Sequence, residues 1–467
     1  MVALGVALTL ADVLAFTGGT LAAPAAGESG FTGVSIDSRT IVAGALFVAL
    51  KGPRFDGHDF LLEAAGRGAT AALVHREAPA PAGLPLVRVA DTTKGLSDLA
   101  RHVRRQAALP IVGVTGSVGK TTTKDMTAHL LATRGPVLKT EGNLNNQYGL
   151  PLTLLRLAPE HTAAVLEMGM SAPGEIRALS RLAEPDVATI TRVAPVHLEF
   201  FPSVDAIAEA KAEILEGLRP GGVAVLNGDD PRVRAIGERF RGRVVWFGWD
   251  RRHDASAESR GGTAFGMRFL LHLGGRTVDV ALPLAGPHFV TSFLAAAAAA
   301  HVLGVSPEAM AEAATSLRPA SHRGEVRRLG EEVVLLDDCY NSSPEALEAA
   351  VVTLGLAPGR RRVAVLGDML ELGPTGPMLH RERGRALAGR VDALAVVGPL
   401  AREILEGARE AGIPAASLHH FADAAEAAAA VPHLIRPGDA VLVKASRAVK
   451  LEAVVDAIAA RFGEERA

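Results

Sequence analysis

Runs of apolar residues alternate with amphipathic segments along most of this chain. Each run is short, is bounded by Gly, Pro or polar residues, and has the length of a buried β-strand. The clearest runs span residues 45–50, 71–74, 109–114, 163–166, 187–191, 333–336, 363–366, 393–397 and 440–443. The segments between many of these runs have helical spacing, so the pattern predicts an α/β protein whose sheets are covered by helices.

Changes in this alternation predict three domains. Residues 1–105 are expected to form a small α/β domain with Gly-rich turns, and residues 106–317 a central domain with a mostly parallel sheet. The alternation restarts after Arg318-Pro319, so residues 318–467 are expected to form a second open, Rossmann-like sheet. A length of 467 residues agrees with about three domains.

Composition restricts the partners that we expect. The 49 basic and 51 acidic residues nearly cancel, so no basic field would hold nucleic acid or an anionic membrane, and a small ligand is favoured. Cys339 is the single cysteine, which excludes an intramolecular disulfide and suits a reducing compartment. The apolar N-terminus has no basic start, and Thr9 before Asp12 indicates a helix cap rather than a signal peptide. We therefore expect a cytoplasmic, monomeric enzyme.

The strand predicted at 109–114 is followed by the pattern G-x-x-G-K-T and then by a helical segment. Glycines let backbone N–H groups close around phosphate oxygens, a helix N-terminus favours anions, and Lys120 adds a cation. The usual longer pattern would need Gly where Val114 stands, and a plain glycine turn is the alternative. The flanking strand and helix favour an ATP site. Its predicted residues are Thr115, Gly116, Ser117, Val118, Gly119, Lys120, Thr121 and Thr122.

Further polar residues follow predicted strands, where ligands bind in open α/β sheets. Glu167 ends one strand and could bind Mg²⁺, or it could be an ordinary exposed acid. His197 follows the strand at 187–191, and a lone His is more often structural than a ligand. Arg323 and Asp338 flank the first strand of the last domain, where the acids at 337–338 are either a site or a surface turn.

Lys211 occupies an unusual position for a lysine. Ser203 is a suitable N-cap, and Ile207, Lys211, Ile214 and Leu218 then follow at helical spacing on one stripe. A helix normally buries such a stripe. The ammonium must therefore snorkel to solvent, which is the default, or find an anion, lose its proton, or be chemically modified.

Taken in order, the motifs of this chain resemble those of the Mur ligases. The matching segments of the central region are 115–121, 142–146 with Gly149 and Pro151, 167–169, His197 and 211–214. Segments 338–344, 366–373 and 442–447 are similar to those of members that act on D-alanyl-D-alanine. Segments 35–39 and 46–52 are similar to the UDP-sugar-binding domain of the same members. The resemblance extends over nearly the whole chain.

This resemblance implies a reaction and a role for each of the three domains. The implied enzyme uses ATP to join D-alanyl-D-alanine to UDP-N-acetylmuramoyl-tripeptide through an acyl phosphate, which gives a cell-wall precursor. Residues 1–105 would bind the UDP-sugar, residues 106–317 would bind ATP, and residues 318–467 would complete the ligase. Lys120 and Thr121 would contact ATP and a first Mg²⁺. Glu167, His197 and a carbamylated Lys211 would hold a second Mg²⁺.

The resemblance also implies contacts for the nucleotide and the substrates. Asn145 and Asn146 match residues near the γ-phosphate, and Arg323 and Asp338 match contacts to phosphate and ribose. The expected substrate-binding residues are Ser35, Asp37, Ser38, Arg39, Lys51, Gly52, Tyr340 and Asn341. Lys444, Ser446 and Arg447 lie in a family-like motif without an assigned contact.

Two departures and two competing interpretations remain. Family members commonly have G-x-H-N-x-x-N before an alanine-rich helix, whereas here Phe289 and Ser292 replace the asparagines, so Phe289 could stack on adenine instead. Ala445 stands where Gly is usual. A neighbouring ligase, adding one amino acid to a muramoyl peptide or glutamate to a folate, shares the central domain. An ATP-dependent switch is the other alternative, but it would not need a second metal.

Overall fold

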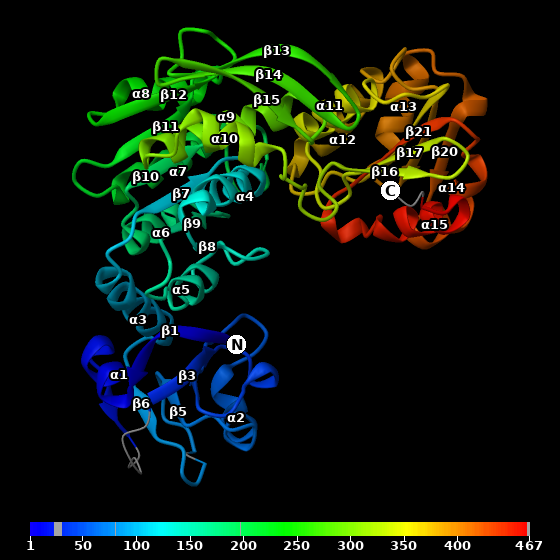
Figure 1. The fold of residues 1–467 in the computed structure, drawn as a ribbon. Coiled ribbons are helices and arrows are strands. Elements are labelled where there is room, and N and C mark those ends of the chain that lie inside the picture. The colour runs from blue at the N-terminus through cyan, green and yellow to red at the C-terminus, as the bar shows by residue number, and fades with distance from the viewer. Residues whose placement is uncertain (23–29, 80, 197, 465–467) are drawn as a thin grey trace. The chain divides into compact units, whose positions relative to one another are not determined.

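The computed structural model describes residues 1–22, 30–79, 81–196 and 198–464. The chain forms two compact units, one of residues 1–115, 134–189 and 212–224, the other of residues 116–133, 190–211 and 225–467. The described residues contain three sheets of six, nine and six strands, shown in Figure 1. The predicted α/β class is confirmed.

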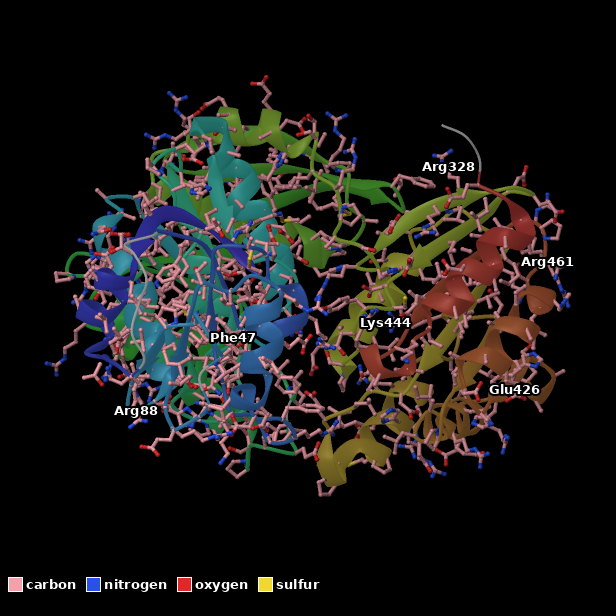
Figure 2. All side chains as sticks on the ribbon, turned by 90° about the horizontal axis from the view of Figure 1, so that it is seen from below. Phe47, Arg88, Arg328, Glu426, Lys444 and Arg461 are labelled. Carbon is pink, nitrogen blue, oxygen red and sulfur yellow. The ribbon has the colours of Figure 1, made fainter. Side chains whose placement is uncertain are left out.

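The first sheet has the strand order β1-β3-β4-β5-β6-β2, with parallel inner strands and antiparallel β1 and β2 at its edges. Its strands are β1 Val2–Thr9, β2 Thr20–Leu21, β3 Gly30–Ser35, β4 Ala45–Val48, β5 Ala71–Val74 and β6 Leu86–Arg88. Helices α1 Leu10–Thr17, α2 Leu61–Gly66 and α3 Thr92–Gln106 accompany it. Phe47, labelled in Figure 2, is 1% exposed in the core. The cap predicted at Thr9 is confirmed, because its side chain accepts from the Asp12 N–H.

The nine-stranded sheet has the order β15-β14-β13-β12-β11-β10-β7-β9-β8. Its strands are β7 Ile111–Thr115, β8 Val137–Lys139, β9 Ala163–Glu167, β10 Val187–Ile190, β11 Val223–Asn227, β12 Arg243–Gly248, β13 Ala255–Thr263, β14 Gly266–Leu273 and β15 Arg276–Leu282. The associated helices are α4 Lys120–Leu131, α5 Gly149–Leu154, α6 Glu175–Ala183, α7 Val204–Ala212, α8 Pro231–Arg239, α9 Pro287–Val302 and α10 Pro307–Ala314. The antiparallel β13, β14 and β15 were not marked by the apolar runs.

The third sheet has the order β16-β17-β21-β18-β19-β20, parallel except for β16. Its strands are β16 Glu325–Leu329, β17 Val333–Asp337, β18 Arg361–Gly367, β19 Ala393–Val397, β20 Leu418–Phe421 and β21 Asp439–Lys444. The accompanying helices are α11 Pro344–Leu354, α12 Gly376–Arg385, α13 Arg402–Glu410, α14 Ala424–Leu434 and α15 Glu452–Phe462. Successive residues of a strand point to opposite faces. Val334 and Leu336 accordingly pack with residues of α11 and α13, and Val333 and Leu335 with residues of α14 and α15; Figure 1 shows α13 and α15 on opposite sides.

The parallel strands of the third sheet end at one edge. In the ladder Asp337 lies beside Val443, and Leu366 beside Lys444. The motifs that follow β17, β18 and β21 therefore meet at this carboxyl edge, where ligands bind in open α/β sheets.

Candidate active site

A glycine-rich loop joins β7 to α4, as the sequence predicts. Gly116 and Gly119 have φ angles of 152° and 86°, which L side chains rarely adopt. A Cβ placed on Gly116 would lie 1.9 Å from Thr191 Oγ1. The loop therefore needs glycine at this position both for its backbone conformation and for its close contact with residue 191.

The Lys120 side chain folds back onto this loop. Its Nζ donates to the Gly116 carbonyl at 2.8 Å. No side chain caps the N-terminus of α4, where Gly119 is the N-cap, and Thr121 and Thr122 lie half-buried in the first turn. A helix N-terminus, a mobile cation and two hydroxyls thus come together, an arrangement suited to binding phosphate.

Gly116→Ala is expected to weaken ATP binding by about 100-fold or more, because backbone N–H groups must approach the phosphates closely. Isothermal titration with ATP and Mg²⁺ measures this, and thermal unfolding checks that the variant folds. Gly221→Ala is the matched control, because Gly221 also has a positive φ of 80° but has open space around its missing Cβ. Equal affinities of the two variants would show that the close contact at Gly116 is unimportant.

Glu167 ends β9 with one unsatisfied oxygen. The residue is 3% exposed. Its Oε1 accepts a hydrogen bond from Asn145 Nδ2 at 2.8 Å, whereas the buried Oε2 has no hydrogen-bond partner in the described structure. A buried polar atom without a partner is costly. Glu167 is therefore not an ordinary exposed acid, and its free oxygen is suited to a metal cation.

Lys211 does not snorkel. It lies in the last turn of α7 and is 2% exposed. Burial is the main cause that lowers its pKa well below the usual value, and the positive charge of Lys120 lowers it further. No carboxylate of the described residues forms an ion pair with its ammonium. The amine is therefore driven toward its neutral, nucleophilic form.

His197 lies outside the described residues. Asn146 uses its side-chain oxygen to accept the N–H groups of Tyr148, at 3.1 Å, and Gly149, at 2.9 Å, beside the start of α5. In this conformation only its NH₂ group remains for a ligand, so the side-chain oxygen of Asn146 supports the local backbone.

A cationic cluster lies at the carboxyl edge of the third sheet. Lys444, 2% exposed, donates to Asp338 Oδ2 at 2.5 Å and to the Asn341 carbonyl at 3.0 Å; it is labelled in Figure 2. The Arg323 guanidinium lies 3.9 Å from the centre of the Tyr340 ring, and that of Arg447 lies 5.6 Å from it. Arg323, which is expected near phosphate, is thus held against an aromatic ring.

Phe289 is not an open platform for adenine. It is 4% exposed and touches the His288 ring, with the ring centres 4.3 Å apart. A Cβ on Gly324 would lie 2.7 Å from the Phe289 ring. The suggestion that Phe289 stacks on the base is wrong for this conformation. Burial, followed by the charge of Lys444, lowers the pKa of the neighbouring His288 to about 4.

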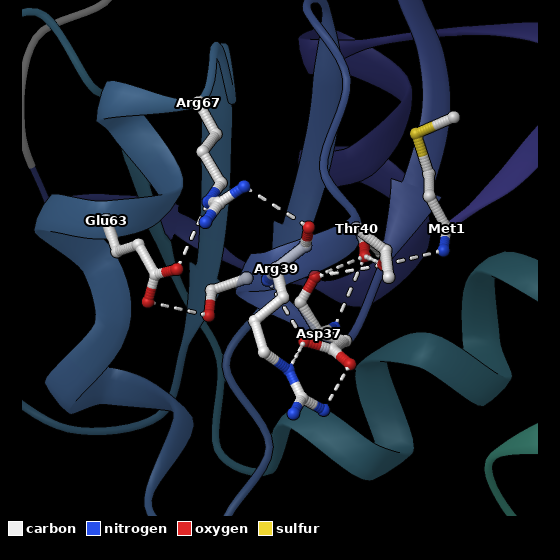
Figure 3. A network of polar contacts seen from close by, with 8 residues as sticks. Met1, Asp37, Arg39, Thr40, Glu63 and Arg67 are labelled. Carbon is white, nitrogen blue, oxygen red and sulfur yellow. Dashed lines mark hydrogen bonds and ion pairs between the residues drawn. The ribbon is translucent and has the colours of Figure 1, made fainter.

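Residues 35–39 gather in one turn after β3. Figure 3 shows Asp37 holding the Arg39 guanidinium through two hydrogen bonds of 2.9 and 2.8 Å. The hydrogen bond from Arg39 is the main cause that lowers the pKa of Asp37 to about 2. Ser35 Oγ donates to the Asp37 carbonyl, and Ser38 Oγ donates to Glu63. Four of the expected substrate-binding residues thus lie together, and the Arg39 side chain is 78% exposed.

Family models match most of the chain. The Mur ligase catalytic domain model matches residues 30–104, the Mur ligase middle domain model matches residues 114–300, and the Mur ligase glutamate ligase domain model matches residues 322–447. The chain belongs to the Mur ligase family.

Individual Mur ligases are similar over nearly their whole length. UDP-N-acetylmuramoyl-tripeptide–D-alanyl-D-alanine ligases of Bacillus subtilis and Escherichia coli are 36% and 38% identical, over 96% and 91% of this chain and 97% and 93% of theirs. A crystal structure of MurF from Acinetobacter baumannii has a TM-score of 0.91 at 34% identity, covering 98% of this chain and 99% of that one. MurF ligase from Thermotoga maritima, in complex with ADP, has a TM-score of 0.82 at 32% identity, covering 92% and 97%.

Three residues of this Mur ligase chain that lie outside the sequence motifs support the glycine-rich loop, directly or through one another. Thr191 Oγ1 donates to the Val118 carbonyl at 2.6 Å, and Asn227 Nδ2 donates to the Thr191 carbonyl at 2.7 Å. Asp230 accepts the Val193 N–H. These side chains brace the glycine-rich loop from the ends of β10 and β11. The one sequence feature that could have indicated a role for Thr191 is its position at the end of a predicted strand.

Within residues 1–22, 30–79, 81–196 and 198–464, none of the helices combines the length and apolar character needed to cross a bilayer.

Proposed function

We propose that this Mur ligase uses ATP to join D-alanyl-D-alanine to UDP-N-acetylmuramoyl-tripeptide. The single observation that carries the proposal is the identity of 36–38% over at least 91% of the chain to ligases that bear this activity in their names. The formed phosphate loop supports the use of ATP, as does the ADP in the Thermotoga maritima relative.

The chemistry follows from the charge of the reacting groups. A carboxylate resists attack by an amine, so an oxygen of the tripeptide's terminal carboxylate first attacks the γ-phosphorus of ATP. ADP leaves, and an acyl phosphate forms. The free amine of D-alanyl-D-alanine then attacks the acyl carbon, phosphate leaves, and the nitrogen loses a proton to give the amide. Two anions must approach each other in the first step, so neutralising their charge is the main catalytic task.

The proposed ATP contacts begin with the glycine-rich loop. The loop's N–H groups and Lys120 would bind the phosphates, and Thr121 would hold a Mg²⁺ ion that neutralises phosphate charge. Asn145 and the NH₂ group of Asn146 act near the γ-phosphate. Arg323 contacts phosphate, and Asp338 contacts the ribose.

We propose two Mg²⁺ ions, the first at Thr121 and the second at Glu167, His197 and Lys211. Bound there, they would neutralise phosphate and carboxylate charge. The unsatisfied Glu167 Oε2 fits a cation. The depressed pKa of Lys211 fits carbamylation, in which its neutral Nζ attacks CO₂, forms an N–C bond and releases a proton. This reaction changes a cation into a carboxylate-like ligand.

The remaining proposals concern the substrate-binding residues, the oligomeric state and the cellular compartment. Residues 1–105 are proposed to bind the UDP-sugar through the turn of Figure 3 and the loop of Lys51 and Gly52. Residues 106–317 would bind ATP, and residues 318–467 would contribute Tyr340 and Asn341 to the substrates. A monomeric enzyme of the cytoplasm fits the single cysteine and the consumption of ATP.

A paired-substrate assay tests the proposal. ATP and Mg²⁺ are supplied with the muramoyl tripeptide, with D-alanyl-D-alanine, with both, or with neither, and phosphate and pentapeptide are measured. We expect turnover only with both substrates, and one phosphate for each pentapeptide. Single amino acids and folates replace the dipeptide and the tripeptide in control reactions. Product with those acceptors would favour a neighbouring ligase, and rapid hydrolysis of ATP alone would favour a switch.

A further inference from the structure

Three side chains of metal-binding type converge beside the first strands of the third sheet. His322 precedes β16, Asp337 is the last residue of β17, and Cys339 follows two residues later. One nitrogen, oxygen or sulfur atom of each lies within 4.8 Å of the other two. In the part of the chain that the structure describes, this is the one group of three or more His, Cys, Asp or Glu side chains placed in this way. The two Mg²⁺ sites proposed above use none of these residues.

The group is buried but has a path to solvent. Asp337 and Cys339 are 0% and 1% exposed, whereas the His322 side chain is 24% exposed. His322 Nδ1 donates to Asp337 Oδ2 at 2.8 Å, and the Cys339 thiol also donates to this carboxylate. His322 has a positive φ of 59°, and its carbonyl accepts the Tyr340 N–H at 3.0 Å, which fixes the backbone that carries the imidazole. Two protons are thus directed at one buried carboxylate, where a cation can replace them.

Arg327 also contacts Asp337, but it has other partners. Its Nη2 lies 3.3 Å from Asp337 Oδ2. Its Nε lies 3.3 Å from a carboxylate oxygen of Glu325, and its Nη1 lies 3.4 Å from one of Glu464. A cation bound to Asp337 can therefore displace Arg327 toward these two acids, and the guanidinium does not lose all its counter-charge.

The set of donor atoms selects the kind of metal. Thiolate sulfur, imidazole nitrogen and carboxylate oxygen are the ligands of Zn²⁺, whereas Mg²⁺ prefers oxygen alone. Tetrahedral Zn²⁺ holds such atoms about 3.5 Å apart, so His322 and Asp337 need to separate by less than about 1 Å. Burial, followed by the charge of Asp337, raises the pKa of the Cys339 thiol. The thiol therefore keeps its proton until a metal ion that binds thiolate strongly replaces it.

We propose that His322, Asp337 and Cys339 form a binding site for Zn²⁺, with water as the fourth ligand. Binding forms Zn–N, Zn–O and Zn–S bonds. Cys339 releases one proton to solvent. The imidazole stays neutral because its proton moves from Nδ1 to Nε2, and the carboxylate exchanges two hydrogen bonds for the metal. No oxidation or reduction takes place.

The ligands of this Zn²⁺ site alternate along the chain with residues proposed to contact nucleotide and substrate. Arg323 follows His322, and Asp338 and Tyr340 lie on either side of Cys339. The Arg323 guanidinium lies 3.9 Å from the centre of the Tyr340 ring. A metal that joins His322 to Cys339 links the two segments that carry this pair, and so holds Arg323 against the ring and away from phosphate. Zn²⁺ is therefore an inhibitor that weakens the use of ATP. This effect on ligation rests on the proposed function, whereas the binding of the metal does not.

Cobalt titration of the full-length, reduced protein tests the site. Cys339 is the single cysteine, so a thiolate-to-Co²⁺ charge-transfer band reports on this residue alone. We expect the band to appear with one bound Co²⁺ and to disappear when Zn²⁺ displaces it. Cys339→Ala should give no band and should bind Zn²⁺ about 100-fold more weakly or less, because it lacks a ligand.

Two histidine variants provide a matched comparison. His322→Asn removes the imidazole, and asparagine tolerates a positive φ, so this variant should fold, as thermal unfolding would show, and should weaken Co²⁺ and Zn²⁺ binding in the same way. His419→Asn changes a histidine of β20, at the opposite edge of the same sheet, and should keep the band and the affinity. A folded, reduced protein without the band, or equal Zn²⁺ affinities of the original protein and Cys339→Ala, would overturn the proposal.

Ligation kinetics test the inhibition. With Mg²⁺ in excess, enough Zn²⁺ to fill the site should raise the KM for ATP of the original protein roughly 5- to 10-fold, the lower range of coupling between two sites. The same Zn²⁺ concentration should leave Cys339→Ala unaffected. Equal inhibition of both proteins would place the effect at the Mg²⁺ sites and would overturn the regulatory role. If the original protein does not ligate even without Zn²⁺, the proposed function fails, while the cobalt band still tests the metal site.

Discussion

Lys211→Ala should lose nearly all ligation, with kcat reduced by about 1000-fold or more, while ATP affinity stays within about tenfold. The expected loss is large because Lys211 is proposed to become a metal ligand that neutralises the reacting anions. ATP affinity is preserved because the glycine-rich loop and Lys120 are unchanged. Ligation kinetics and isothermal titration with ATP measure the two quantities separately.

Lys211→Met distinguishes a carbamate from a packing role. Methionine fills a similar volume in the buried stripe but cannot react with CO₂, so it should be as inactive as alanine. In the original protein, ¹³C-bicarbonate should give a carbamate signal by NMR, and removal of CO₂ should reduce activity reversibly. An active Lys211→Met variant, or a fully active enzyme without the carbamate signal, would contradict the proposal.

Buried parallel strands are the part of this fold that the sequence predicts best. All five residues of β17 are buried, and its first four, Val333 to Leu336, are apolar on both faces, so the strand appears as a continuous run. In β13 only the first three residues are buried and the other six are exposed. An exposed antiparallel strand needs no apolar run, because its pairing comes from the backbone, and this explains why β13, β14 and β15 were missed.

Some features of the candidate site involve residues that are close together in the sequence, and others involve contacts between distant segments. Only the first kind can be predicted from the sequence. Residues 115–122 are contiguous, so their glycines and lysine are visible as a motif, and the position of Lys211 on an apolar stripe correctly signals an unusual environment. Bracing by Thr191 involves a carbonyl 73 residues away. The burial of Phe289 depends on packing near Gly324. Neither contact leaves a pattern in a single sequence, because it depends on which segments the fold brings together.

Lys120→Met should reduce ligation by about 1000-fold or more, since the lysine ammonium would no longer neutralise charge on the β- and γ-phosphates. The Lys120 ammonium donates to the Gly116 carbonyl, a contact that phosphate oxygens can replace. Ligation kinetics measure the loss. Thermal unfolding should show a folded protein, because the half-buried methionine keeps the apolar stem of the side chain. Activity within tenfold of the original protein would exclude a central role for this cation.

The same variant tests an electrostatic link between the two lysines. Lys120 is the second cause, after burial, of the depressed pKa of Lys211. Removing the Lys120 charge should raise the pKa of Lys211, reduce the neutral amine at a given pH, and shift carbamate formation to higher pH. Lys120→Arg keeps the charge but changes its shape, so it should retain the original carbamate profile while transferring phosphate poorly. If both variants had the same carbamate profile, the two lysines would act independently, and burial alone would prepare Lys211 for CO₂.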